Sequence, residues 1–383
     1  MSEFHIVHQG FDKLDVAFTG GFNAELIPLL NALKEKAQRE DEAQLCEIGP
    51  GRLPVHVYDR GMSGGYAYRL NNGPLGANFY AKENVNQTEW NLFATSQAEG
   101  LLAYGLTGYF DRMCADWRAM GAVVGKESVN RVDYAVDFAC PRLDLRPELF
   151  VCPPRTKSRV HYGAGEFRDD LAPIVLTCGR RVESVTAGRM PGRQLIVYNK
   201  GVEAQQKRKL IWLERWGFDP RAADLEVWRV EMRAGKHELK EHYGLTTFKD
   251  VVDSIGDVFK KAIQDVRYLS DARTDSNVTR ADKHPLWIAL AVALQSGLNK
   301  HESGLAPGRI IEIQRQELVD RCLDNVAGNS LSLACAQGMT AEQALTELPN
   351  RVATMLRDRF EDQPRKIHEK LEQVKDRYRF LEP

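Results

Sequence analysis

Residues 130–138, NRVDYAVDF, alternate polar and apolar side chains over a full strand length. Successive side chains in a strand point to opposite faces of the sheet, so the valines, the tyrosine and the phenylalanine share one face. Asp133 and Asp137 share the other face with Arg131. Because Asp is a poor strand former, two of them in an otherwise apolar strand indicate a role beyond folding. A merely solvated polar face is the alternative.

Two later segments repeat this pattern. Residues 226–233, EVWRVEMR, place Arg229, Glu231 and Arg233 on one face of a predicted strand. An acid between two arginines is typical either of cross-strand salt bridges or of a phosphate-binding surface. Residues 193–200, RQLIVYNK, place Tyr198 and Lys200 on one face of another predicted strand. An ordinary interfacial tyrosine remains the alternative there.

The order of such patterns along the chain predicts the α+β class, with a largely antiparallel, curved sheet and flanking helices. Residues 11–19 have the alternation of an edge strand, and residues 202–215 have the spacing of one charged helix. We expect a first domain over residues 1–270, a polar linker over residues 271–284 and an all-helical C-terminal region over residues 285–383.

Positive charge is concentrated in residues 151–216, which contain thirteen Lys or Arg and six Asp or Glu, although the whole chain has a net charge of −1. Lysines and arginines bind phosphates in part by displacing counterions, so this segment is a candidate surface for a polyanion. A solvated surface balanced by acids elsewhere is the alternative.

Composition excludes several other classes. No apolar stretch approaches the roughly 20 residues of a membrane-spanning helix, and the first residues lack the pattern of a secretory signal. We therefore expect a cytoplasmic protein that does not contact a membrane. The seven cysteines form no CxxC pair, which favours buried free thiols over a zinc site or a disulfide framework.

If the three charged strands adjoin, their residues form one chemical site. Carboxylates would bind Mg²⁺ or Mn²⁺, which prefer hard oxygen ligands. A phenol, with an ordinary pKa near 10, is a weak nucleophile that a cation and neighbouring Lys or Arg would activate. Charge favours phosphate contacts for five residues: Lys200, Arg189, Arg193, Arg229 and Arg233. This set suits the transesterification of a phosphodiester.

Four segments in this order resemble the Rep_trans replication initiation factors, which include rolling-circle plasmid initiators, filamentous-phage replication proteins and conjugative-element relaxases. The segments are FDKLDVAF, NRVDYAVDF, VTAGRMPGRQLIVYNKG and VWRVEMR. They lie within residues 10–250. The chain also lacks a His-x-His pair, in keeping with a family that binds metal through acids.

The resemblance implies a DNA nicking and joining domain over residues 1–270. It implies that Tyr198 attacks the scissile phosphate, leaving a 5′-phosphotyrosyl strand and a 3′-OH primer. Asp133 and Glu231 are implied as metal ligands, with Asp137 as a third. Origin DNA, in single-stranded or hairpin form, is the implied partner; a host helicase and a second copy of the chain are further candidates. A DNA-binding regulator without enzymatic activity is the alternative function.

Overall fold

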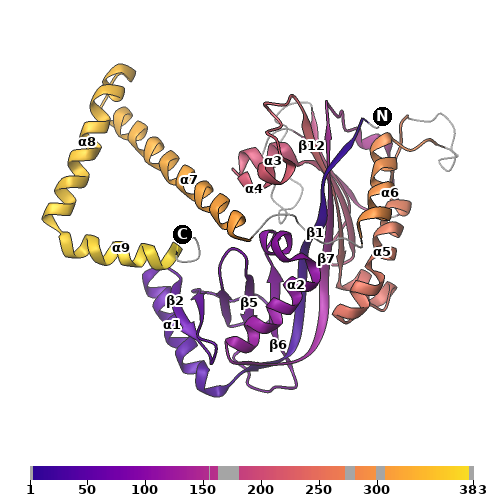
Figure 1. Cartoon of the computed structure of the whole chain (residues 1–383), viewed down its shortest axis with the longest axis horizontal. Helices are drawn as coiled ribbons and strands as arrows, with labels where there is room; N and C mark the ends of the chain where they lie inside the picture. Colours follow the sequence, from indigo (N-terminus) through magenta and orange to yellow (C-terminus); the bar gives the residue numbers. More distant parts are fainter. Residues whose placement is uncertain (1–2, 155, 163–180, 272–280, 299–306, 379–383) are drawn as a thin grey trace. The chain divides into compact units, whose positions relative to one another are not determined.

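The computed structural model describes residues 3–154, 156–162, 181–271, 281–298 and 307–378 (Figure 1). The chain divides into two compact units, Met1–Ile310 and Ile311–Pro383. An eleven-stranded sheet in the order β2-β3-β4-β5-β6-β1-β7-β12-β11-β10-β9 forms the framework of the first unit, and its neighbouring strands run antiparallel. The predicted α+β class, with an antiparallel sheet and a helical C-terminal region, is confirmed.

The strands follow the alternating segments of the sequence. In chain order they are β1 (His5–Phe22), β2 (Gln44–Ile48), β3 (Leu53–Val57), β4 (Tyr68–Asn71), β5 (Ala77–Ala81), β6 (Trp90–Ser96), β7 (Ala122–Cys140), β8 (Phe150–Val151), β9 (Ser158–Tyr162), β10 (Val182–Gly188), β11 (Arg193–Asn199), β12 (Glu226–Gly235) and β13 (Arg267–Tyr268). The short β8 and β13 pair separately.

The helices of the first unit are α1 (Ile27–Glu40), α2 (Ala98–Ala119), α3 (Lys200–Gln206), α4 (Leu210–Trp216), α5 (Phe248–Asp265) and α6 (Pro285–Gly297), with short helical turns η1 (Ala24–Leu26), η2 (Pro147–Leu149) and η3 (Glu238–His242). A capping box between Thr247 and Asp250 satisfies backbone groups at the start of α5.

The first predicted strand lies at the centre of the sheet and not at its edge. β1 pairs with β6 along one side and with β7 along the other. Its alternate residues Leu14, Val16 and Phe18 are buried in the core, as in any strand with one face on the core, so alternation alone does not distinguish a central strand from an edge strand. The expectation of an edge strand is wrong, because β1 has a neighbouring strand on each side.

Different helices cover the two faces of the sheet around β7 and β12. Figure 1 shows α5 and α6 on one side of these strands, with α3 and α4 on the other. The apolar face packs against α5, where the rings of Tyr134 and Phe259 lie 5.8 Å apart. The polar face is covered by α4, whose Trp212 ring lies 5.2 Å from the imidazole of His8. Of the charged residues predicted on β7 and β12, Asp137 and Arg229 contact α4 through Trp216 and Trp212.

The single charged helix expected over residues 202–215 is instead two short helices. Arg208 adopts a φ of 50°, which ends helical geometry between α3 and α4. The resulting corner turns the apolar residues Ile211 and Trp212 back onto the sheet, where both are buried.

The division between the two units lies after Ile310, beyond the predicted linker, of which residues 272–280 lie outside the described part. α6 belongs to the first unit because Leu286 and Trp287 are buried in its core. The second unit consists of α7 (Pro307–Ala336) from Ile311 onward, α8 (Ala341–Asp362) and α9 (Pro364–Tyr378).

None of the described helices combines the length and the apolar character needed to cross a bilayer. The cysteines of the described residues are free thiols. Cys114 and Cys140 are buried as expected, whereas Cys322 and Cys335 are exposed. Cys178 lies outside the described residues.

Candidate active site

The register of β11, β12 and β7 brings the predicted site residues onto one face of the sheet. Tyr198 pairs with Arg229, which in turn pairs with Asp137. Four residues along β12, Arg233 pairs with Asp133 on β7. Because side chains two and four residues apart share a face, Glu231 lies between these two rows.

Asp137 and Arg229 form a completely buried ion pair. Asp137 Oδ1 accepts a hydrogen bond from Arg229 Nε at 2.6 Å, and Oδ2 accepts one from Arg229 Nη2 at 3.0 Å and another from Trp216 Nε1 at 3.0 Å. Arg229 Nη1 also donates to Asp12 Oδ1 at 2.9 Å. Burial is the largest single influence and would raise the pKa of Asp137, but the charge and hydrogen bonds of Arg229, together with His8 and Trp216, lower the pKa overall.

Two further carboxylates, Asp133 and Glu231, lie toward the other end of the same face. Arg131 holds Asp133 in a bidentate pair, with its Nε 2.9 Å from Oδ1 and its Nη2 2.6 Å from Oδ2. Arg233 Nε donates to Glu231 Oε1 at 2.7 Å and lies 3.8 Å from Asp133 Oδ2, so it bridges the two acids. Burial raises the pKa of Asp133 to about 7, and the charge of Glu231 adds to this effect while Arg131 opposes it.

Tyr198 lies within this network of charges and not in an apolar interior. Its hydroxyl donates a hydrogen bond to Glu231 Oε2 at 3.2 Å. The residue is only 7% exposed, and this burial, opposed by Arg229, raises the pKa of the phenol well above its ordinary value. A phenol with a raised pKa stays protonated at neutral pH, so it can act as a nucleophile only if a base accepts its proton. Glu231 accepts a hydrogen bond from this hydroxyl and is in position to do so.

Lys200 is the first residue of α3, because β11 ends at Asn199. Its Nζ lies 5.6 Å from the centre of the Tyr198 ring and 5.0 Å from that of Trp212, and it donates to a carboxylate oxygen of Glu203. Burial, together with the charge of Arg229, lowers the pKa of Lys200 to about 8. The ammonium is therefore close to Tyr198, but it is already paired.

The three predicted metal ligands do not fit a divalent cation as they are arranged. Both oxygens of Asp137 are taken by Arg229 and Trp216. Asp133 and Glu231 share a face, but guanidinium groups lie where a cation would bind them. Within the described ranges, no three or more His, Cys, Asp or Glu side chains form a group that could hold a metal ion.

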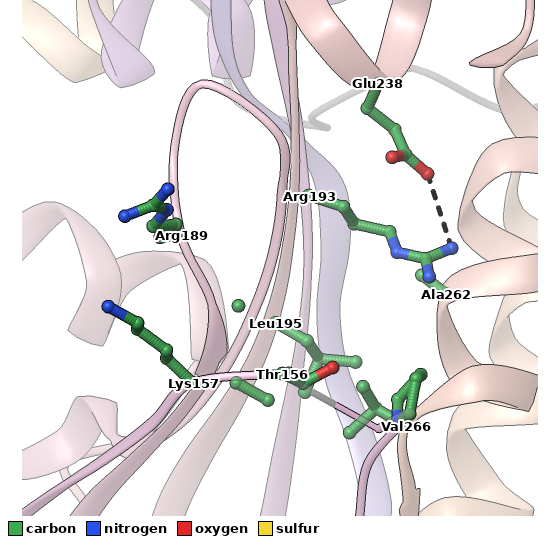
Figure 2. A pocket seen from close by; sticks show the side chains of 11 residues that line it. Thr156, Lys157, Arg189, Arg193, Leu195, Glu238, Ala262 and Val266 are labelled. Atoms are coloured by element: carbon green, nitrogen blue, oxygen red, sulfur yellow. Dashed lines mark ion pairs between the residues drawn. The ribbon is translucent and has the colours of Figure 1, made fainter.

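Arg193 lies away from this cluster, on the face of β11 that carries α5. It forms ion pairs with Asp265 at 2.6 Å and with Glu238 at 3.4 Å. Figure 2 shows Arg193 directed toward Glu238, with Lys157 and Arg189 on the other side of the turn. These residues border a pocket of about 250 Å³, which is lined in part by α5. Strand alternation puts Arg193 and Tyr198 on opposite faces of β11, because they are five residues apart. The positive charge of the segment gives no sign of this separation.

The predicted phosphate contacts thus differ in their surroundings. Lys200, Arg229 and Arg233 are buried and paired with acids, whereas Arg189 is exposed in the β10–β11 turn. Within the basic segment, Lys157 and Arg159 are also exposed. Three of its cations, Arg155, Arg168 and Arg180, lie outside the described residues.

Sequence reasoning assigned no site role to three members of the network, namely Asp12, Arg131 and Trp216. Alternation places Arg131 on the strand face of Asp133, and this shared face is the signal for their contact. Asp12 lies in the FDKLDVAF segment, at an irregularity in the pairing of β1 with β7. No local pattern signals Trp216, because it reaches Asp137 from a helix that is distant along the chain.

Comparison with solved structures finds a similarity to a rolling circle replication initiator protein from Geobacillus stearothermophilus. The sequence identity is 13% and the TM-score is 0.41, and the match covers 75% of this chain and 96% of that chain. No family model matches the chain. No curated protein sequence matches it. A similarity of this size establishes neither a family nor an activity.

Proposed function

We propose that this protein is a replication initiator that cuts and rejoins one strand of origin DNA, with Tyr198 as the nucleophile. The observation that carries the proposal is the hydrogen bond from the Tyr198 hydroxyl to Glu231, within a network that also contains Arg229. A hydroxyl, a carboxylate and guanidinium groups lie together on one face of the sheet, which supports an assignment as nucleophile, base and phosphate-binding cations. The resemblance of four sequence segments to replication initiators supports the same activity.

The geometry supports the following reaction. Glu231 accepts the proton of the Tyr198 hydroxyl as the phenolic oxygen attacks the phosphorus. The bond between phosphorus and the 3′ oxygen breaks, leaving a 5′-phosphotyrosyl strand, and the departing oxygen takes a proton to become a 3′-OH. Attack by a 3′-OH on the phosphotyrosine reverses these steps and rejoins the strand.

The covering of the site sets a condition on this reaction. Tyr198 is 7% exposed, and the guanidinium of Arg229 lies 4.2 Å from the centre of the Trp212 ring of α4. A phosphodiester therefore reaches the hydroxyl only when α3 and α4 move aside. The two helices are short and are separated by the break at Arg208. Such a movement would therefore disrupt few backbone hydrogen bonds.

Dependence on Mg²⁺ or Mn²⁺ is a separate part of the prediction. A cation at Asp133 and Glu231 would have to displace the guanidinium groups of Arg131 and Arg233. Nicking assays with added Mn²⁺, and with a chelator in its place, test this part independently of the nucleophile.

Replacement of Tyr198 by Phe tests the proposal. The Tyr198→Phe variant should no longer nick a supercoiled plasmid that carries origin DNA, but should still bind that DNA. Tyr134→Phe is a matched control, because Tyr134 is also buried and its hydroxyl has no hydrogen-bond partner among the described residues. Nicking at the normal rate by Tyr198→Phe would show that another group is the nucleophile.

The burial of Tyr198 also favours a second candidate, a DNA-binding regulator without enzymatic activity. In that protein, the buried ion pairs would only stabilise the fold. Gel shifts with origin DNA, combined with the absence of any covalent protein–DNA adduct in the presence of Mn²⁺, would support this second function over the first.

A further inference from the structure

The N-terminal half of the sheet carries aromatic and basic side chains on the face that continues from the Tyr198 cluster. Arg69 on β4 pairs with Tyr80 on β5, which pairs with Phe93 on β6. All three side chains are partly exposed, whereas their strand neighbours Leu70 and Phe79 are fully buried on the opposite face. The exposed rings are therefore not part of the main core.

Four rings make up this feature, which we call the aromatic ladder: Tyr58, Tyr66, Tyr80 and Phe93. The Phe93 ring lies 5.9 Å from that of Tyr66 and 6.2 Å from that of Tyr80. Both pairs are tilted, and all three residues are partly exposed. An open row of rings on a sheet is the arrangement on which unpaired bases stack.

Two cations lie on the ladder. The guanidinium carbon of Arg69 is 4.2 Å from the centre of the Tyr58 ring, and Lys82 Nζ is 5.5 Å from that of Tyr66. Within the described residues neither cation has a carboxylate partner, although Arg69 Nη2 donates to Asn78 at 3.1 Å. The buried Nε of Arg69 has no hydrogen-bond partner there. The ladder therefore carries positive charge that the described part of the chain does not neutralise.

The long strands β1 and β7 connect the aromatic ladder with the Tyr198 cluster. Phe93 pairs with Ala17 on β1, which pairs with Ser128 on β7. Asp137, in the row of Tyr198, lies further along β7. From Ser128 to Asp137 the strand spans roughly 30 Å at about 3.3 Å per residue. A single strand of several nucleotides could follow this face from the rings to the cluster.

We propose that the aromatic ladder binds single-stranded DNA, with bases stacked on Tyr66, Tyr80 and Phe93 and phosphates held by Arg69 and Lys82. The inference rests on the proposed function, since the bound strand is the one that Tyr198 would cut. Stacking accepts every base, so the ladder holds the strand without reading its sequence. A duplex presents no free base faces and binds this surface less tightly.

Fluorescence anisotropy with a labelled mixed-sequence oligonucleotide tests the ladder, with a duplex of equal length for comparison. Tyr80→Leu and Phe93→Leu keep apolar bulk and remove the rings, and each should weaken binding of the single strand roughly tenfold. Tyr104→Leu is the matched control: Tyr104 is also partly buried, and the guanidinium carbon of Arg112 lies 4.8 Å from its ring centre, but it lies on α2. This control should bind like the wild type.

A charge variant provides an independent measurement if the leucine variants fold poorly. Arg69→Gln should weaken binding and reduce the slope of log affinity against log salt by about one ion. Thermal melting of each variant shows whether its fold is intact. Wild-type affinity in folded Tyr80→Leu and Phe93→Leu, an unchanged salt slope in Arg69→Gln, or a wild type that binds the duplex in preference would each overturn the inference.

The two proposals fail in different ways. If Tyr198→Phe stops nicking while the ladder variants bind normally, the ladder inference is wrong and the proposed function stands. If the ladder variants lose affinity while Tyr198→Phe still nicks, the nucleophile is wrong and the binding surface stands.

Discussion

The buried pair of Arg229 with Asp137 gives the most direct test of the network. Arg229→Met keeps the volume of the side chain but leaves the Asp137 carboxylate, which is fully buried, without its cation. Of the side-chain hydrogen bonds described for Asp137, only the one from Trp216 would remain. Removing one partner of a buried ion pair costs about 3–5 kcal/mol, because the other charge stays desolvated.

The companion change removes the charge left behind. In Arg229→Met with Asp137→Asn, the neutral amide no longer requires a cation and can still accept the hydrogen bond of Trp216. The double variant should therefore be more stable than the sum of the two single changes predicts, by about 2–3 kcal/mol. The loss of the Arg229 contact with Asp12 is common to both Arg229 variants and cancels in the cycle.

Urea unfolding followed by tryptophan fluorescence measures these free energies. All six tryptophans lie before residue 310, so the signal reports on the first compact unit alone. A single variant Arg229→Met within about 0.5 kcal/mol of the wild type, or strictly additive effects in the cycle, would show that Asp137 and Arg229 are not paired in a buried site in solution.

Two further predictions use the same unfolding measurement. Gly188→Ala should destabilise the protein by about 3 kcal/mol or more, because the φ of Gly188 is +88° and a Cβ would lie 2.2 Å from the carbonyl oxygen of Arg193. Gly217→Ala should cost only about 1 kcal/mol, because Gly217 has a φ of +78° but open space where a Cβ would lie. Equal losses of stability in the two variants would contradict this reasoning. The pKa of Asp133 is raised from 3.8 to about 7, so the folded state binds its proton more tightly than the unfolded state does. Its contribution to stability is present below about pH 4 and is lost as the pH rises to about 7. The free energy of unfolding of the wild type, relative to that of Asp133→Asn, should therefore fall over this pH range. A difference that stays constant with pH would rule out the raised pKa.

Local chemistry in the sequence determined which face of a strand each residue occupies. Side chains alternate in any extended strand, so Tyr198, Glu231 and Asp133 could be assigned to polar faces without knowing which strands are neighbours. The apolar residues between them predicted the opposite, core-facing side. The same alternation separates Arg193 from Tyr198, although the positive charge of the segment favoured grouping them.

Only the tertiary structure decided which charges of different strands meet. Arg229 and Asp137 are far apart along the chain, and their pairing depends on the register of β12 against β7, which no local pattern specifies. That register gives Asp137 its arginine partner, whereas Asp133 and Glu231 are paired with arginines of their own strands. The break at Arg208 separates α3 from α4, whose Trp212 lies over the guanidinium of Arg229. The sequence could name the groups of the site, but their burial and mutual neutralisation arise from contacts between distant strands and helices.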